Sequence, residues 1–113
     1  MMVSVANTKA YDWGKSGKGW PLVNTDGLSV IEELMPPGTE EEMHSHEICQ
    51  QFFYILNGSA TFIVDAQSHT LNENQGIHIK SGVAHQIRNE TSENLIFLVV
   101  SQPRSHGDRK TID

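Results

Sequence analysis

The sequence predicts an all-β protein. Short apolar segments recur along the chain, several of them alternate apolar with polar residues, and turn-forming residues separate them. The clearest turn is Asn57-Gly58, which lies between two such segments and is the strongest short signal for a β-hairpin. Many short strands separated by regular turns are typical of a β-sandwich or a β-barrel.

The expected strands follow one another from residue 28 onward. The first, 28–35, begins after Asp26-Gly27 and ends at Pro36-Pro37-Gly38, where two prolines and a glycine stop a strand. Strand 51–56 leads into the Asn57-Gly58 turn and strand 60–64 leaves it. Further strands are expected at 77–79, 84–88 and 95–100, after a mixed N-terminal part of strands and loop (1–27) and before a polar tail (101–113).

Residues 39–56 also match a helix. Thr39 to Glu42 has the pattern of a helix capping box, and the apolar residues between Ile48 and Leu56 fall at helical spacing. On a helix, however, His44 and His46 would point about 200° apart, whereas on a strand residues i and i+2 share a face. If the two histidines act together, the segment is extended.

Composition limits the classes of function. The chain has 113 residues, enough for one domain, and a formal net charge of −6, which disfavours nucleic-acid binding because that needs a basic surface. The longest apolar run, 95–100, is far shorter than the roughly 20 residues of a membrane span, so we expect no membrane partner. Cys49 is the only cysteine, and the first ten residues show no basic segment followed by an apolar one. The expected compartment is therefore the cytoplasm.

Three histidines suggest a metal site. His44 and His46 are two residues apart and would share one face of a strand, and His85 belongs to a later strand. Two imidazoles from one strand, a third from a neighbouring strand and one oxygen donor make a plausible site for a first-row divalent metal.

At this point the sequence resembles the cupin family of small double-stranded β-helix, or jelly-roll, barrels. The first family motif matches from Gly38 through His44-Ser45-His46 to Gly58, with Gln51 where the family has an acid. The second motif runs over 74–89 and keeps Gly82, His85 and Asn89, with Asn74 in place of the usual turn glycine. The resemblance covers 38–89 and implies a single cupin domain over 1–113. It also implies that the protein forms a homodimer.

The resemblance implies a metal ligand set of His44, His46, Gln51 and His85 around a divalent transition metal (Zn, Ni, Fe, Mn or Co). A similar set of three histidines and one glutamine occurs in cupin-type aromatic polyketide cyclases. A neutral amide in place of a carboxylate leaves the metal more positive, which strengthens its Lewis acidity, favours anionic ligands and weakens its retention.

Either Gln50 or Gln51 is a possible donor. Strict alternation from His46 would select Gln50, whereas counting back from Gly58 by the family spacing selects Gln51. The second choice requires a turn through 47–49 that resets the phase of the strand.

Other residues are candidates for the surroundings of the metal. Glu32 and Glu33 lie in an alternating strand. If this strand lines the barrel, one of them points inward as an acid/base or as a partner of a ligand histidine, whereas on an edge strand both would be partly exposed. Arg109 would bind a substrate carboxylate if the tail covers a barrel mouth, and the tail is otherwise a frayed end. The expected apolar pocket residues are Phe53, Ile55, Phe62 and Phe97.

Two functions follow from this set. The first is a small-molecule enzyme of the dioxygenase, cyclase or isomerase type, whose metal acts as a Lewis acid or activates O₂. Its expected substrate is a small oxygenated molecule, aromatic ones included. The second is a non-catalytic cupin that binds or senses a metal or small molecule.

Overall fold

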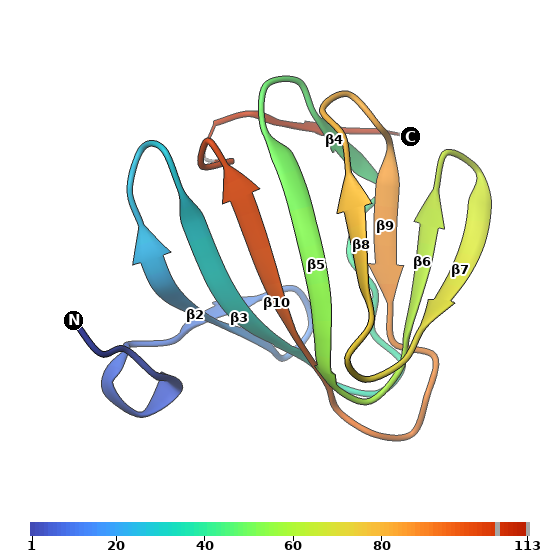
Figure 1. Ribbon diagram of the computed structural model, residues 1–113. Helices are drawn as coiled ribbons and strands as arrows, with labels where there is room; N and C mark the ends of the chain where they lie inside the picture. Colours follow the sequence, from blue (N-terminus) through green and yellow to red (C-terminus); the bar gives the residue numbers. More distant parts are fainter. Residues whose placement is uncertain (106, 113) are drawn as a thin grey trace.

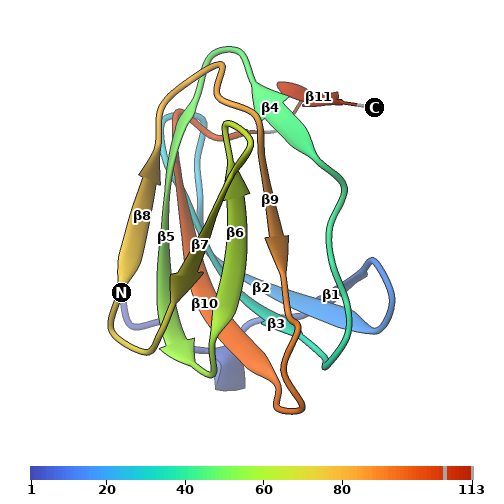
Figure 2. The same cartoon turned by 90° about the vertical axis from the view of Figure 1, so that its right-hand side faces the viewer.

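The computed structural model describes residues 1–105 and 107–112, so that His106 and Asp113 lie outside the described part of the tail. Its strands form two antiparallel sheets that face each other (Figures 1 and 2). The six-stranded sheet contains, in spatial order, β1 (Tyr11–Trp13), β2 (Gly17–Asn24), β3 (Ser29–Met35), β10 (Leu95–Gln102), β5 (Gln50–Asn57) and β8 (Gly76–Ile79). The five-stranded sheet contains β11 (Arg109–Thr111), β4 (His44–His46), β9 (His85–Arg88), β6 (Ala60–Val64) and β7 (Gln67–Leu71).

The all-β prediction is confirmed, and the helical alternative for 39–56 is wrong. The only helix among the described residues is a short 3₁₀ turn, Val5–Asn7. Residues 39–56 instead form β4 and β5, which pair with β9 and with β10 and β8. The tertiary pairing overrides the local helical pattern because each of these strands pairs with strands that are distant in the sequence.

The core lies between the two sheets. Along β10, buried residues alternate with half-buried ones, so Leu95, Phe97, Val99 and Ser101 face inward. Phe53 and Ile55 meet them from the neighbouring strand β5, and Phe62 of β6 meets them from the other sheet. The apolar end of this core holds the barrel together and leaves the other end free for polar side chains.

Two turns have the backbone that their residues favour. Gly58, in the hairpin between β5 and β6, has φ +87°, a conformation in which a side chain is strained. A Cβ there would also meet the Asn94 carbonyl oxygen at 2.9 Å. Asn74 has φ +66°, so it does occupy the left-handed position for which the family motif has glycine.

The described part of the tail pairs with the barrel. Its strand β11 pairs with β4, with Arg109 opposite His46 and Thr111 opposite His44 (Figure 2). The backbone N–H of Ile112 also donates to the Met43 carbonyl at 2.9 Å. The tail therefore lies beside the strand that carries two of the predicted ligands. No helix of the described chain has the length and apolar character needed to cross a membrane.

Candidate metal centre

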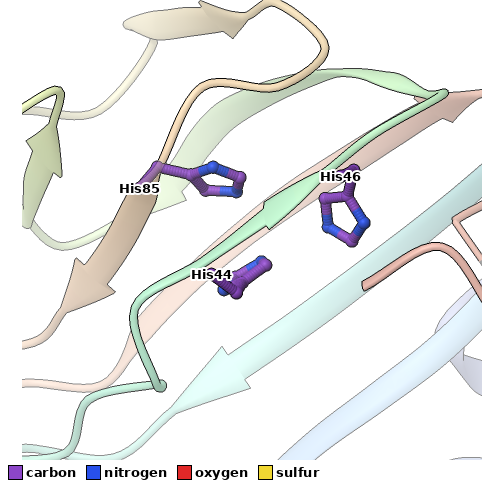
Figure 3. A group of neighbouring side chains, drawn as sticks. All are labelled: His44, His46 and His85. Carbon is purple, nitrogen blue, oxygen red and sulfur yellow. The ribbon is translucent and has the colours of Figure 1, made fainter. Parts of the chain in front are cut away.

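Two neighbouring strands bring the three histidines together. His44 and His46 project from the same face of β4, and His44 lies opposite His85 of β9 in the strand register. The ring centroid of His44 lies 5.0 Å from that of His46 and 4.4 Å from that of His85. One nitrogen of each ring lies within 4.8 Å of the others, so the three buried imidazoles could hold one metal ion (Figure 3).

Backbone carbonyls select the tautomer of two of these rings. The Nδ1–H of His44 donates to the Glu42 carbonyl at 2.8 Å, and the Nδ1–H of His85 donates to the Val83 carbonyl at 2.9 Å. With the proton on Nδ1, the Nε2 atom of each ring carries a free lone pair. Carbonyl groups in this position are the usual means of orienting histidine ligands of a metal.

Gln51 joins the histidines through its amide oxygen. The Gln51 side chain is buried, and its Oε1 lies 3.1 Å from Nε2 of His85, while its Nε2–H donates to Oγ of Ser101 at 3.0 Å. Both Oε1 and the unprotonated Nε2 are acceptors, so they repel each other unless a cation lies between them. The Ser101 hydroxyl thus keeps the amide in the orientation that a metal ligand needs.

His46 supplies the third observation in favour of a metal. Its Nδ1 is the only buried side-chain nitrogen or oxygen without a hydrogen-bond partner in the described part of the chain. A buried unsatisfied nitrogen is costly, which calls for a missing partner at this ring. The donor set of three imidazoles and one amide oxygen fits a divalent transition metal.

Burial keeps all three imidazoles neutral. It lowers the pKa of His44 to about 3, although the hydrogen bond to Glu42 acts in the opposite direction. Burial is also the main cause that lowers the pKa of His46 and of His85. A neutral imidazole is the form that binds metals, so little proton competition is expected near neutral pH.

The fold and these residues agree with what sequence comparison finds. The cupin-domain family model matches residues 31–101, which is more than half of the chain. The chain belongs to the cupin family.

Individual relatives share about a third or less of their aligned residues with this cupin. An uncharacterized protein of Methanocaldococcus jannaschii is 27% identical over 75% of this chain and 69% of its own length. Auxin-binding protein 1 of Arabidopsis thaliana is 32% identical over 68% of this chain and 45% of its own length. The structure of the polyketide cyclase RemF from Streptomyces resistomycificus superimposes with a TM-score of 0.85 at 20% identity, over 100% of this chain and 87% of that one. At that identity the likeness to RemF shows the fold alone.

A cavity of about 290 Å³ opens beside the histidines of this cupin. His44, His46 and Gln51 line it together with Glu33 and Arg109. The ligand residues, an acid and a guanidinium thus share one space. Of the two acids that the sequence singled out, Glu33 lines the cavity, whereas Glu32 lies on the opposite face of β3, in register with the outward-facing Leu98.

The predicted apolar pocket is divided by the structure. Phe53 lines the cavity, and its ring lies 5.9 Å from that of His85. Ile55, Phe62 and Phe97 are fully buried in the core and are not part of the cavity wall. Val99 and Ile31 line the cavity instead, because they lie level with Phe53 on neighbouring strands.

Sequence reasoning missed a second acid. Glu41 lies in the run of three glutamates before the histidines, a pattern typical of a solvated loop, yet its side chain is largely buried and lines the cavity. Its backbone N–H donates to the Ile87 carbonyl at 3.1 Å, and its Oε1 accepts from the Ile87 N–H at 3.2 Å. Only this pairing with β9 turns Glu41 inward, and no local pattern reports it.

Burial changes the ionisation of these acids. It raises the pKa of Glu33 to about 8, helped by the Glu41 charge and opposed by Arg109. Burial likewise raises the pKa of Glu41 to about 7, opposed by Arg109. Tyr11, which also lines the cavity, has its pKa raised to about 12 by burial and by Glu33. Glu33 is therefore protonated near neutral pH and able to give or take a proton there.

The raised pKa of Glu33 predicts a pH-dependent stability. The folded state holds this proton more tightly than the unfolded state, so the contribution of Glu33 to stability falls as pH rises from 4.5 to about 8. Glu33→Gln should remove that loss. The free energy of unfolding of the variant, measured by urea denaturation, should gain on that of the native protein through this range and stay level above it.

Glu32→Gln is the matched control for this experiment, since Glu32 is the neighbouring acid on the outer face of β3. A difference between Glu33→Gln and the native protein that does not change with pH would contradict the assignment of a buried, protonated carboxyl.

Proposed function

We propose that this chain is a metal-dependent enzyme that moves a proton on a small oxygenated substrate, as cyclases and isomerases do. The observation that carries the proposal is that Glu33, protonated near neutral pH, lines the same cavity as His44, His46 and Gln51. A divalent transition metal bound there would polarise a substrate oxygen and so acidify the neighbouring C–H bond. A group with a pKa near the working pH is the best partner for such a proton.

The residues of the cavity divide the work. Glu33 exchanges the proton, and Glu41, whose charge raises the pKa of Glu33, keeps it within range. Arg109 stands at the mouth and offers a planar guanidinium to an anionic group of the substrate. Phe53 and Val99 supply an apolar wall that limits water around the substrate.

The net charge of the cavity supports an anionic or enolisable substrate. The metal ligands are neutral side chains, Glu33 is uncharged near neutral pH, and the positive charge of Arg109 offsets the partial negative charge of Glu41. A divalent cation in this set would keep its full charge, which favours a substrate that carries or develops negative charge. This charge balance favours proton transfer over dioxygenase chemistry, because neutral ligands stabilise high oxidation states of a metal poorly.

The comparisons add limited support. The cyclase named in the RemF structure has the same fold, and auxin-binding protein 1 is named for a small molecule that it binds. Because the second protein is named for binding, the alternative to an enzyme is a non-catalytic cupin that binds a small molecule.

Replacement of one histidine tests the metal. His85→Ala should remove the bound divalent metal, measured by elemental analysis of the purified protein, while the circular dichroism spectrum of the β-barrel is retained. Turnover of β-diketone and catechol-like substrates should disappear with the metal. Metal content equal to that of the native protein would refute the centre, and tight metal without turnover of any substrate would favour the binding cupin.

The amide ligand gives a prediction of its own. Gln51→Glu should bind the metal more tightly, because a carboxylate adds a negative charge to the centre, and turnover should fall as the metal loses Lewis acidity. Competition with a chromophoric chelator measures the affinity. An unchanged affinity would show that residue 51 does not reach the metal.

We also propose that the barrel forms a homodimer through the outer face of the six-stranded sheet. Apart from Glu32, that face is apolar across four adjacent strands, and apolar surfaces of this kind mark interfaces. Its residues are Trp20, Val30, Leu34, Phe52, Tyr54, Ile96, Leu98 and Val100.

Light scattering of the native protein should give twice the mass of one chain. Leu98→Glu should give the mass of a single chain, whereas the control Ser68→Glu, on exposed β7, should stay dimeric. A native monomer would refute this interface.

A further inference from the structure

The carboxylate of Asp108 binds the turn that separates the metal ligands. Its Oδ1 accepts the backbone N–H groups of Glu47 and Ile48, each at 3.1 Å. Its Oδ2 accepts the N–H of Ile48 at 3.0 Å and that of Cys49 at 2.9 Å. Three successive backbone donors thus converge on one side chain, which comes from the tail about sixty residues later in the sequence.

This turn decides which glutamine reaches the centre. The turn 47–49 lies between His46, the last residue of β4, and β5, which starts at Gln50. Without the turn, strict alternation from His46 would direct Gln50 inward. With it, Gln51 is buried at 6% exposure next to His85, and Gln50 is exposed.

The tail also lies beside His46. Arg109 pairs with His46 in the β11–β4 register, so Asp108 lies directly beside the end of β4. The backbone of Asp108 therefore lies next to His46, and its side chain binds the turn that leads to Gln51.

A second cluster of possible metal-ligand atoms, all within 4.8 Å of one another, is formed by His46, Cys49 and Asp108. Its contacts indicate that Asp108 holds the turn and does not bind a second metal. The Asp108 carboxylate is already engaged by backbone donors. Burial and this carboxylate together raise the pKa of the Cys49 thiol to about 11, so the thiolate that a metal requires is disfavoured.

We propose that Asp108 is a positioning residue of the metal centre: by holding the turn 47–49, it sets the strand phase that delivers Gln51 to the same point as His46. The inference rests on the proposed metal binding, and it assigns a role to a residue outside both family motifs. Its consequence is that the tail, although remote in sequence, is required for the full ligand set.

A double-mutant cycle tests this role with Co²⁺ as the probe. Asp108→Ala should lower Co²⁺ affinity by roughly 10- to 100-fold, the usual effect of removing a group that orients a ligand. Gln51→Ala should lower it similarly, and the double variant should bind no more weakly than Gln51→Ala alone. The visible absorption of the Co²⁺-saturated proteins should change in the same way for both single variants. Lys110→Ala, an exposed neighbour on β11, is the matched control and should bind like the native protein.

The outcomes separate this inference from the metal proposal. Independent losses that add in the double variant, or an Asp108→Ala protein with native affinity, would overturn the positioning role. If Asp108→Ala does not fold, Asp108→Asn, which keeps one acceptor oxygen, is used in the same cycle. His85→Ala reports on the metal itself: native Co²⁺ affinity in that variant would refute the centre, whereas its loss together with additive Asp108 and Gln51 effects would refute only the role of Asp108.

Discussion

The candidate centre depends on a change of strand phase between His46 and Gln51. An uninterrupted strand would place His44, His46 and Gln50 on one face and leave Gln51 outside. The bend at 47–49 interrupts the alternation by three residues, an odd number, and so reverses the face on which the following side chains lie. After the bend the chain passes from one sheet, which contains β4, to the other, which contains β5, and both strands direct a candidate donor inward. The two sheets of the barrel are therefore linked through the site, since His44, His46 and His85 come from one sheet and Gln51 from the other.

The same end of the barrel carries its buried charge. Glu33 belongs to β3 and Glu41 to the segment that precedes β4, and both line one cavity, where burial raises the pKa of both carboxyls. Such burial is costly in an apolar core, but here Arg109 opposes both shifts and the Ile87 N–H binds Glu41. The apolar residues Ile55, Phe62 and Phe97 pack the opposite part of the interior. Stability and chemistry are thus separated along the barrel.

The sequence predicted the parts of this arrangement that fixed spacing controls. His44 and His46 share a face because they are two residues apart, and the Asn57-Gly58 turn anchors the count that selects Gln51. It could not choose between Glu32 and Glu33, because that choice depends on which face of β3 meets Phe97 in the register. It likewise could not show that Glu41 is buried or that Asp108 binds the turn, since both depend on pairing between strands that are distant in sequence.

A neutral residue at position 51 is consistent with the acids around it. If Gln51 were a carboxylate, the centre would have one more negative charge close to Glu33 and Glu41, which would raise the pKa of both carboxyls further and keep them protonated. Glu33 would then be a poorer acceptor of a proton near neutral pH. With an amide at 51, the positive charge of a bound cation and of Arg109 acts on Glu33 without that opposition. In the proton transfer that we propose, a neutral ligand at position 51 would therefore help Glu33 to act as the proton acceptor.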